Sequence, residues 1–260
     1  MATYGFIGTG SMGGAVAKAA AKAVGGGNLF LANRTPAKAE ALAAELGGRA
    51  CDNGTAARQD YIFLGVKPQM MAGMLEGIRP VLRERMEKGE TFTLVTMAAS
   101  LTIEKIREMA GVEAPTVRIM PNLPISIGKG VILYTASGAE KTLPGLLEAL
   151  SPAGMLLPVE ERLIDAGSAV AGCGPAFACL FIEALADGGV ACGLPRAQAQ
   201  ALALQMLAGT AELLLQTDQH PAALKDAVCS PGGTTIAGVH ALEKGGFRAA
   251  AFDAVKAAYD

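Results

Sequence analysis

The pattern of apolar and polar positions changes near residue 158. Before it, short apolar runs typical of buried strands alternate with amphipathic stretches typical of helices. Strands are expected at residues 3–7, 28–32, 60–66, 92–96, 115–119, 130–134 and 155–158, with a short strand and loop at 50–53. Helices are expected at about 11–24, 36–46, 70–86, 102–109 and 140–150. This alternation predicts an α/β domain with a mostly parallel sheet over residues 1–158.

After residue 158 the pattern is helical in every window. The expected helices cover about 160–170, 175–192, 195–217, 222–228, 236–244 and 247–258, which predicts an all-helical second domain over residues 159–260. Residues 176–215 are rich in small side chains and carry almost no charge between Arg196 and Glu212. Such helices would leave a large apolar face exposed on a monomer, so we expect an obligate oligomer.

Composition narrows the classes of function. A net charge of -2 without a cluster of lysines and arginines argues against a nucleic-acid partner. The five cysteines lack a CxxC pair, which is typical of reduced thiols in a cytoplasmic protein, and the two histidines cannot build a metal site. The chain starts on a strand pattern, so no signal peptide is expected. Glu183 and Asp187 interrupt the most apolar window, 176–194, which argues against a membrane partner.

A glycine-rich turn joins the first expected strand to the first helix. Gly8-Thr9-Gly10-Ser11-Met12-Gly13 has the G-x-G-x-x-G spacing in the strand–turn–helix context that dinucleotide binding requires. Gly8 permits the tight turn, Gly10 lets the backbone approach a pyrophosphate, and Gly13 allows close packing of helix and strand. The pattern favours a Rossmann-like domain. A glycine-rich turn in another α/β fold, such as a methyltransferase, is the alternative.

The end of the second expected strand indicates which dinucleotide binds. An acidic residue there would bind the free ribose of NAD, but the sequence has Asn33-Arg34-Thr35. Arg34 offers a positive charge for the 2′-phosphate of NADP, so NADPH is the expected cofactor and NADH a weaker one. The alternative is a solvated arginine beside a capping Thr35.

The segment Cys229-Ser230-Pro231-Gly232-Gly233-Thr234-Thr235 separates two expected helices near the end of the chain. Its glycines expose backbone N–H groups at a helix N-terminus, and three hydroxyls surround them. This chemistry suits a small carboxylate. The alternative is a helix–loop–helix corner in which the hydroxyls only cap.

Motifs along the whole chain resemble those of the pyrroline-5-carboxylate reductases. They lie at Gly8–Met12, Val66–Gln69, Met120–Asn122, Gly174–Ala176 and Val228–Gly238. The resemblance implies that NADPH reduces 1-pyrroline-5-carboxylate, a cyclic imino acid, to L-proline in the last step of proline biosynthesis. It also implies a homodimer formed by the helical domain, and larger rings of dimers that family members often build.

The resemblance, together with the motifs above, assigns roles to individual residues. Thr235 is the expected catalytic residue, because it would hydrogen-bond the imine nitrogen. The expected substrate-binding residues are Ser230, Gly232, Gly233, Thr234, Thr235 and Glu161, although a solvated Glu161 in the first turn of a helix is an equal alternative. The expected cofactor-binding residues are Ile7, Gly8, Thr9, Gly10, Ser11, Met12, Gly13, Asn33, Arg34, Asn53, Val66, Lys67, Pro68, Ala98 and Asn122.

Two other functions stay open at this point. A β-hydroxyacid dehydrogenase shares the glycine-rich opening but uses a lysine early in its helical part, and no lysine occurs here between Lys141 and Lys225. A non-catalytic NADP sensor would be expected to have a degraded substrate loop. The chain also departs from the reductase family at Ala171, Cys173 and Phe177, where hydroxyl-bearing residues are usual.

Overall fold

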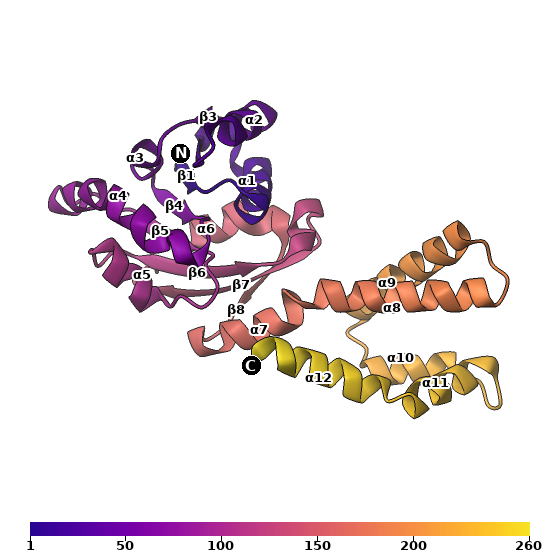
Figure 1. Cartoon of the computed structure of the whole chain (residues 1–260). Coiled ribbons are helices and arrows are strands. Elements are labelled where there is room, and N and C mark those ends of the chain that lie inside the picture. The colour runs from indigo at the N-terminus through magenta and orange to yellow at the C-terminus, as the bar shows by residue number, and fades with distance from the viewer. The chain divides into compact units, whose positions relative to one another are not determined.

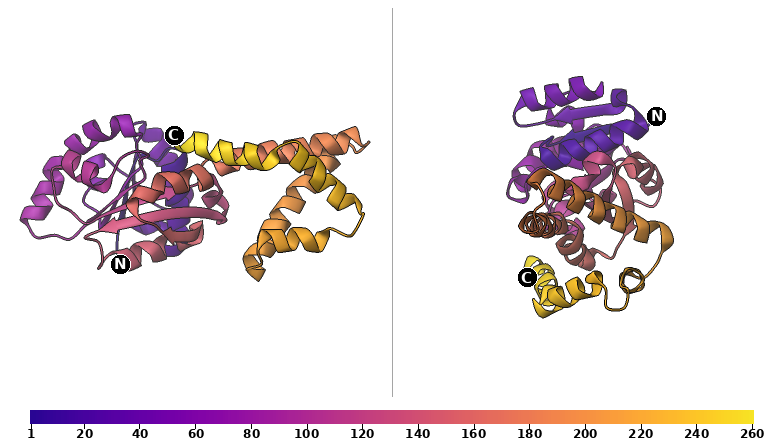
Figure 2. Two further views of the ribbon diagram at one scale, coloured as in Figure 1. Left: turned by 90° about the horizontal axis from the view of Figure 1, so that it is seen from below. Right: turned by 90° about the vertical axis from the view of Figure 1, so that its right-hand side faces the viewer.

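The computed structural model describes residues 1–260 and divides them into two compact units, Met1–Gly172 and Cys173–Asp260. The first unit holds every strand, and the second consists of helices (Figures 1 and 2). The expected Rossmann-like sheet followed by a helical region is therefore confirmed. The strands end at Pro158, but the first unit continues to Gly172 because helix α7 (Ile164–Ala171) packs on strand β7 (Gly130–Ser137).

The sheet has eight strands in the order β3-β2-β1-β4-β5-β6-β7-β8, and only the β6–β7 pair is antiparallel. Besides β7, the strands are β1 (Tyr4–Ile7), β2 (Leu29–Ala32), β3 (Arg49–Ala50), β4 (Tyr61–Leu64), β5 (Thr93–Thr96), β6 (Thr116–Pro121) and β8 (Gly154–Pro158). Ile7 pairs with Ala32 on one side and Leu64 on the other, so three carboxyl ends are level. The strand order reverses beside β1, which is where open α/β sheets bind ligands.

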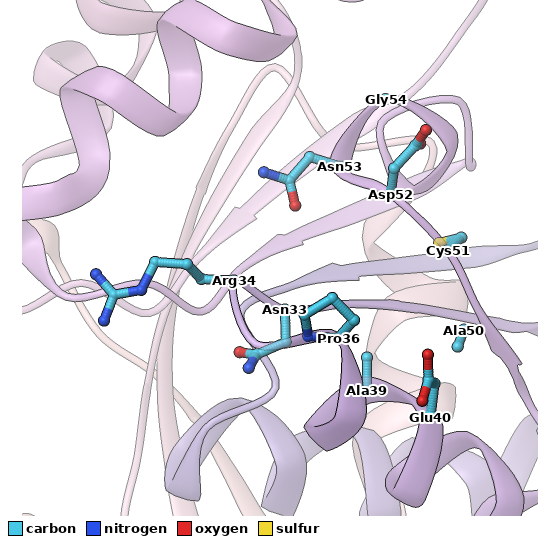
Figure 3. Close-up of a pocket in the computed structure, with 10 residues that line it drawn as sticks. All are labelled: Asn33, Arg34, Pro36, Ala39, Glu40, Ala50, Cys51, Asp52, Asn53 and Gly54. Carbon is cyan, nitrogen blue, oxygen red and sulfur yellow. The ribbon is translucent and has the colours of Figure 1, made fainter.

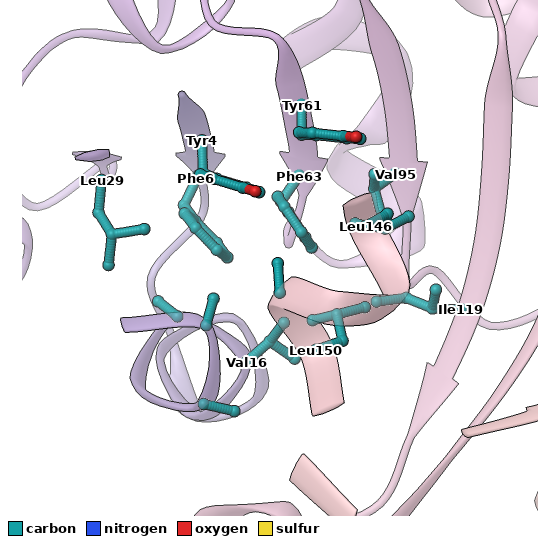
Figure 4. Close-up of a cluster of buried hydrophobic side chains, with 14 of the residues drawn as sticks. Tyr4, Phe6, Val16, Leu29, Tyr61, Phe63, Val95, Ile119, Leu146 and Leu150 are labelled. Carbon is teal, nitrogen blue, oxygen red and sulfur yellow. The ribbon is translucent and has the colours of Figure 1, made fainter. Parts of the chain in front are cut away.

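Helices cover both faces of this sheet (Figure 1). One face packs against α1 (Ser11–Val24), α2 (Pro36–Leu46) and α6 (Leu143–Leu150), and the other against α3 (Asn53–Ala56), α4 (Pro68–Glu87) and α5 (Ile103–Ala110). Under α1 and α6, the rings of Phe6 and Phe63 stack with centroids 4.3 Å apart, beside Val16 and Leu146 (Figure 4). The apolar strand runs form this core because removing their side chains from water drives folding.

The structure corrects two expected boundaries. In the stretch expected as a short strand and loop at 50–53, the strand already ends at Ala50 and Asn53 begins α3, because Asp52 accepts a hydrogen bond from the N–H of Thr55 at 2.6 Å and caps that helix. The helix expected from residue 236 begins at Thr234, so α11 (Thr234–Lys244) starts directly after the paired glycines.

The second unit has almost no core of its own. Its helices are α8 (Gly174–Ala191), α9 (Arg196–Thr217), α10 (Pro221–Val228), α11 and α12 (Phe247–Tyr259), and α8 packs along α9. Its buried apolar side chains are three alanines, Ala186, Ala199 and Ala203, while large apolar residues such as Leu180 and Phe252 are about two-thirds or more exposed, at 67% and 71%. Such a surface requires a partner to cover it.

The stretch Glu161–Ala191 is long and apolar enough to cross a membrane by length and composition alone. Within α8, Glu183 is exposed and Asp187 forms an ion pair with Arg196 of α9. Charged groups of this kind suit a helix that packs against protein better than one that faces lipid.

Candidate active site

The turn between β1 and α1 leaves open space for a ligand at Gly10. Gly8 has a φ of +101°, and a Cβ atom there would lie 2.6 Å from the carbonyl carbon of Gly65. At Gly13, a Cβ atom would overlap the carbonyl oxygen of Gly8. At Gly10, by contrast, a Cβ atom would meet nothing within 4 Å. The first turn of α1 also has no side-chain cap, so its N–H groups are free to bind an anion.

A cavity of about 870 Å³ extends from this turn across the carboxyl ends of β1, β2 and β4. Eight of the expected cofactor residues line it, namely Ile7, Gly8, Gly10, Asn33, Arg34, Asn53, Val66 and Lys67. The sequence reasoning missed four further side chains on its wall, Lys38, Gln69, Met70 and Met74. The cavity has the position and backbone donors that an extended dinucleotide needs.

A second hollow of about 640 Å³ lies between α2 and α3 (Figure 3). It shares Asn33, Arg34 and Asn53 with the first, and Figure 3 shows Arg34 extended away from Asn33. The Nδ2 of Asn33 donates to the carbonyl of Thr35 at 3.1 Å. On its wall, burial and the neighbouring Asp52 raise the pKa of the Cys51 thiol to about 11, so Cys51 stays protonated at neutral pH and is no nucleophile.

The other expected cofactor residues do not line the larger cavity, the one that begins at the turn between β1 and α1. Ser11, Met12 and Gly13 form the first turn of α1, Thr9 precedes it with a buried hydroxyl that has no partner, and Pro68 begins α4. Ala98 is buried after β5. Both polar atoms of the Asn122 side chain have partners within the first unit, because its Nδ2 donates to the carbonyl of Ala171 at 2.9 Å and its Oδ1 accepts from the N–H of Val131 at 2.8 Å.

In the second unit, the loop before α11 presents uncommitted donors. Gly232 has a φ of +68°, and the N–H of Gly233 donates to the carbonyl of Ser230 at 3.0 Å. The hydroxyls of Ser230, Thr234 and Thr235 make no hydrogen bond within the chain, and α11 has no side-chain cap. A hollow of about 630 Å³ adjoins the two glycines. The loop can therefore bind a small anion without breaking a bond of its own.

Lys225 is a residue of this hollow that the sequence reasoning missed. It lies on α10 and lines the hollow together with Gly232, Gly233 and His240. Its hydrogen bond to Asp226 raises the pKa of the ammonium, which therefore remains charged beside the loop. The sequence offered only one signal for it, a lysine seven residues before the paired glycines, near the end of the helix expected at 222–228.

Glu161 has partners inside the first unit. Its Oε1 accepts a hydrogen bond from the N–H of Ile103, the first residue of α5, at 2.7 Å. The same oxygen lies 3.7 Å from the guanidinium of Arg118, a buried residue of β6 that also binds Asp165 at 2.8 Å. The carboxylate thus caps a helix and compensates a buried charge; its expected role at the substrate stays a prediction.

Comparison with known proteins identifies the family. A family model described as pyrroline-5-carboxylate reductase dimerisation matches residues 161–260, and one described as NADP oxidoreductase, coenzyme F420-dependent, matches residues 3–89. The chain is 36% identical over 261 residues to a pyrroline-5-carboxylate reductase of Pisum sativum, which covers 98% of this chain and 93% of the relative. This chain belongs to the pyrroline-5-carboxylate reductase family.

Other relatives agree with this membership. A pyrroline-5-carboxylate reductase of Synechocystis is 43% identical over 219 residues, which are 80% of this chain and 76% of the relative. The structure of the Plasmodium falciparum pyrroline carboxylate reductase with NADP bound has a TM-score of 0.85 at 33% identity and covers 99% of this chain and 95% of that one. The expected resemblance is confirmed.

Gly10→Ala tests the cofactor turn in this reductase. The new methyl group meets no protein atom but occupies the open space at the turn, so we expect NADPH binding to weaken by about tenfold or more, at about 1.4 kcal/mol per tenfold. Gly14→Ala is the matched control, because its Cβ atom would lie at ordinary contact distance, 3.6 Å from the carbonyl oxygen of Thr9. NADPH titration and thermal unfolding measure both effects. Equal NADPH affinity in the two variants would contradict the assignment.

Proposed function

We propose that this chain reduces 1-pyrroline-5-carboxylate to L-proline with NADPH, the last step of proline biosynthesis. The observation that carries the proposal is the match to pyrroline-5-carboxylate reductases over nearly the whole chain, which includes both the glycine-rich turn and the loop before α11. The comparisons give no support to a β-hydroxyacid dehydrogenase or to a non-catalytic NADP sensor.

Recognition of the substrate carboxylate is the task of the loop from Ser230 to Thr235. Free N–H groups at the start of α11 and three uncommitted hydroxyls supply donors for both carboxylate oxygens. Holding the carboxylate fixes the ring and its C=N bond in one orientation, which removes much of the entropic cost of the reaction. Placement by this loop is then the main contribution of the protein to catalysis.

The reaction needs little help from the protein with proton transfer. NADPH supplies the hydride when bound, and the imine accepts it readily once its nitrogen is protonated. A protonated imine can arrive from solvent, so the site needs a hydrogen-bonding group at that nitrogen and no strong general acid. Thr235 provides such a group, because its hydroxyl is exposed at the first turn of α11 and has no partner in the chain.

NADPH fits the residues at the end of β2 better than NADH. Arg34 forms no ion pair and lines the cavity beside Asn33 and Thr35, where a 2′-phosphate would lie next to the ribose. No carboxylate lines that cavity to accept a hydrogen bond from the 2′-hydroxyl of NADH.

The activity assay is oxidation of NADPH by the purified protein with 1-pyrroline-5-carboxylate, run beside NADH. We expect turnover with both cofactors and a higher kcat/KM for NADPH. A sample that binds NADPH but oxidises neither cofactor with the imino acid would overturn the proposed reaction while leaving the cofactor site intact.

Thr235→Ala tests the catalytic assignment. Loss of one hydrogen bond to the imine nitrogen, which is charged in its protonated form, costs about 1.5–3 kcal/mol, so kcat/KM for the imino acid should fall roughly tenfold to a hundredfold. Thr235→Ser keeps the hydroxyl and should retain most activity, and NADPH affinity should be unchanged in both variants. An unchanged kcat/KM in Thr235→Ala would remove Thr235 from the mechanism.

Assembly as a homo-oligomer is supported by the dimerisation model over residues 161–260 and by the uncovered apolar helices of the second unit. We propose a homodimer formed through this unit, as a building block for a larger ring of dimers. Sedimentation velocity at several protein concentrations should show a dimer or a multiple of it, and a stable monomer of 26.4 kDa would contradict the proposal.

The compartment that suits this enzyme is the cytoplasm. All five cysteines are free, and no disulfide constrains either unit. Free, partly exposed thiols persist in a reducing compartment. Cell fractionation with an antibody against the chain checks this location.

A further inference from the structure

We propose that Lys38 acts together with Arg34 as a second determinant of NADPH specificity, by binding the 2′-phosphate that distinguishes NADPH from NADH. The inference rests on the proposed function only in using NADPH as the cofactor. Neither the G-x-G-x-x-G motif nor Arg34 at the end of the second strand predicts a role for Lys38.

The position of Lys38 follows from the start of α2. Its backbone N–H donates to the carbonyl of Thr35 at 3.0 Å, which fixes the first turn of the helix directly after Arg34. The side chain is exposed and lines the same cavity as Arg34 and Thr35. Thr35, at the N-cap position, makes no capping hydrogen bond, so its hydroxyl is also free.

The larger cavity and the neighbouring hollow between α2 and α3 differ in the charges of the residues that line them. The larger cavity is lined by three cations, Arg34, Lys38 and Lys67, and by no carboxylate. The neighbouring hollow is lined by two carboxylates, Glu40 and Asp52, beside the shared Arg34. The larger cavity is therefore the one suited to the phosphate groups of a dinucleotide.

Lys38 is not neutralised by its own helix. The acidic residues of α2 are Glu40, which lines the other hollow, and Glu45, which pairs with Lys18 of α1 at 2.7 Å. Neither Arg34 nor Lys38 has a carboxylate within ion-pair distance, although both are exposed. A phosphate near pH 7 carries close to two negative charges, so it has room for both an arginine fork and a lysine point charge.

Binding measurements on the full chain test Lys38 without the imino acid. Lys38→Met removes the charge and keeps an unbranched side chain, so affinity for NADPH should fall about fivefold to tenfold, as one exposed charge contact allows. Affinity for NADH should change less than about twofold, because NADH lacks the phosphate. The same contrast should appear between 2′,5′-ADP and 5′-AMP, which lack nicotinamide.

Three further variants make the test specific. Lys38→Arg keeps the positive charge and should retain most of the wild-type affinity for NADPH. Arg34→Met should lower the affinity for NADPH, as Lys38→Met does. Lys22→Met, an exposed lysine in the last turn of α1, removes one positive charge elsewhere and should change neither affinity. The NADPH affinity of the wild type should also fall more steeply with sodium chloride than that of Lys38→Met.

The outcomes separate this proposal from the proposed reaction. Equal losses for NADPH and NADH would place Lys38 at the pyrophosphate and overturn its role in specificity, as would no loss for either. A selective loss for NADPH in a protein that fails to reduce the imino acid would support Lys38 and overturn the reaction instead.

Discussion

The close approach of three backbone segments at Gly8 is the constraint on which the cofactor site depends. The N–H of Gly8 donates to the carbonyl of Ala32, and the N–H of Gly65 donates to the carbonyl of Ile7, both at 2.8 Å. Side chains at Gly13 or Gly65 would overlap the carbonyl oxygen of Gly8. None of these segments can move apart without breaking the two hydrogen bonds at the carboxyl ends of the strands. Helix α1 therefore begins at a fixed point, and its free N–H groups face the cavity.

The two units reach stability by different routes. The first buries aromatic and aliphatic side chains on both faces of its sheet and holds its own core. The second buries little beyond Ala186, Ala199 and Ala203, and its large apolar side chains, such as Leu215 at 69% exposed, stay in contact with solvent in a single chain. Its folding is therefore linked to assembly, and its stability should depend on the concentration of the protein.

Sequence periodicity predicted the strands and long helices of the first unit, because apolar runs such as Tyr61–Leu64 have few alternatives to a buried strand. It missed α3 and the early start of α11, since both depend on local backbone hydrogen bonds at Asp52 and Gly233. The role of Lys38 could not be predicted for another reason. A lysine in a helix pattern is typical of a solvated surface residue, and only the folded turn shows that Lys38 lines the same cavity as Arg34.

Glu161 illustrates how a buried charge limits what a nearby residue can do. Arg118 is 2% exposed in β6 and has only the carboxylates of Glu161 and Asp165 as counter-charges, while its Nε has no partner. If Glu161 turned to a substrate, Arg118 would lose one counter-charge and the N–H of Ile103 would lose its acceptor. Arg118 would keep Asp165 at 2.8 Å, so the cost stays below the roughly 3–5 kcal/mol of a buried pair broken outright, but the unpaired N–H of Ile103 adds to it. That cost favours a Glu161 that stays in place and holds η4 (Glu161–Leu163) and α5 together.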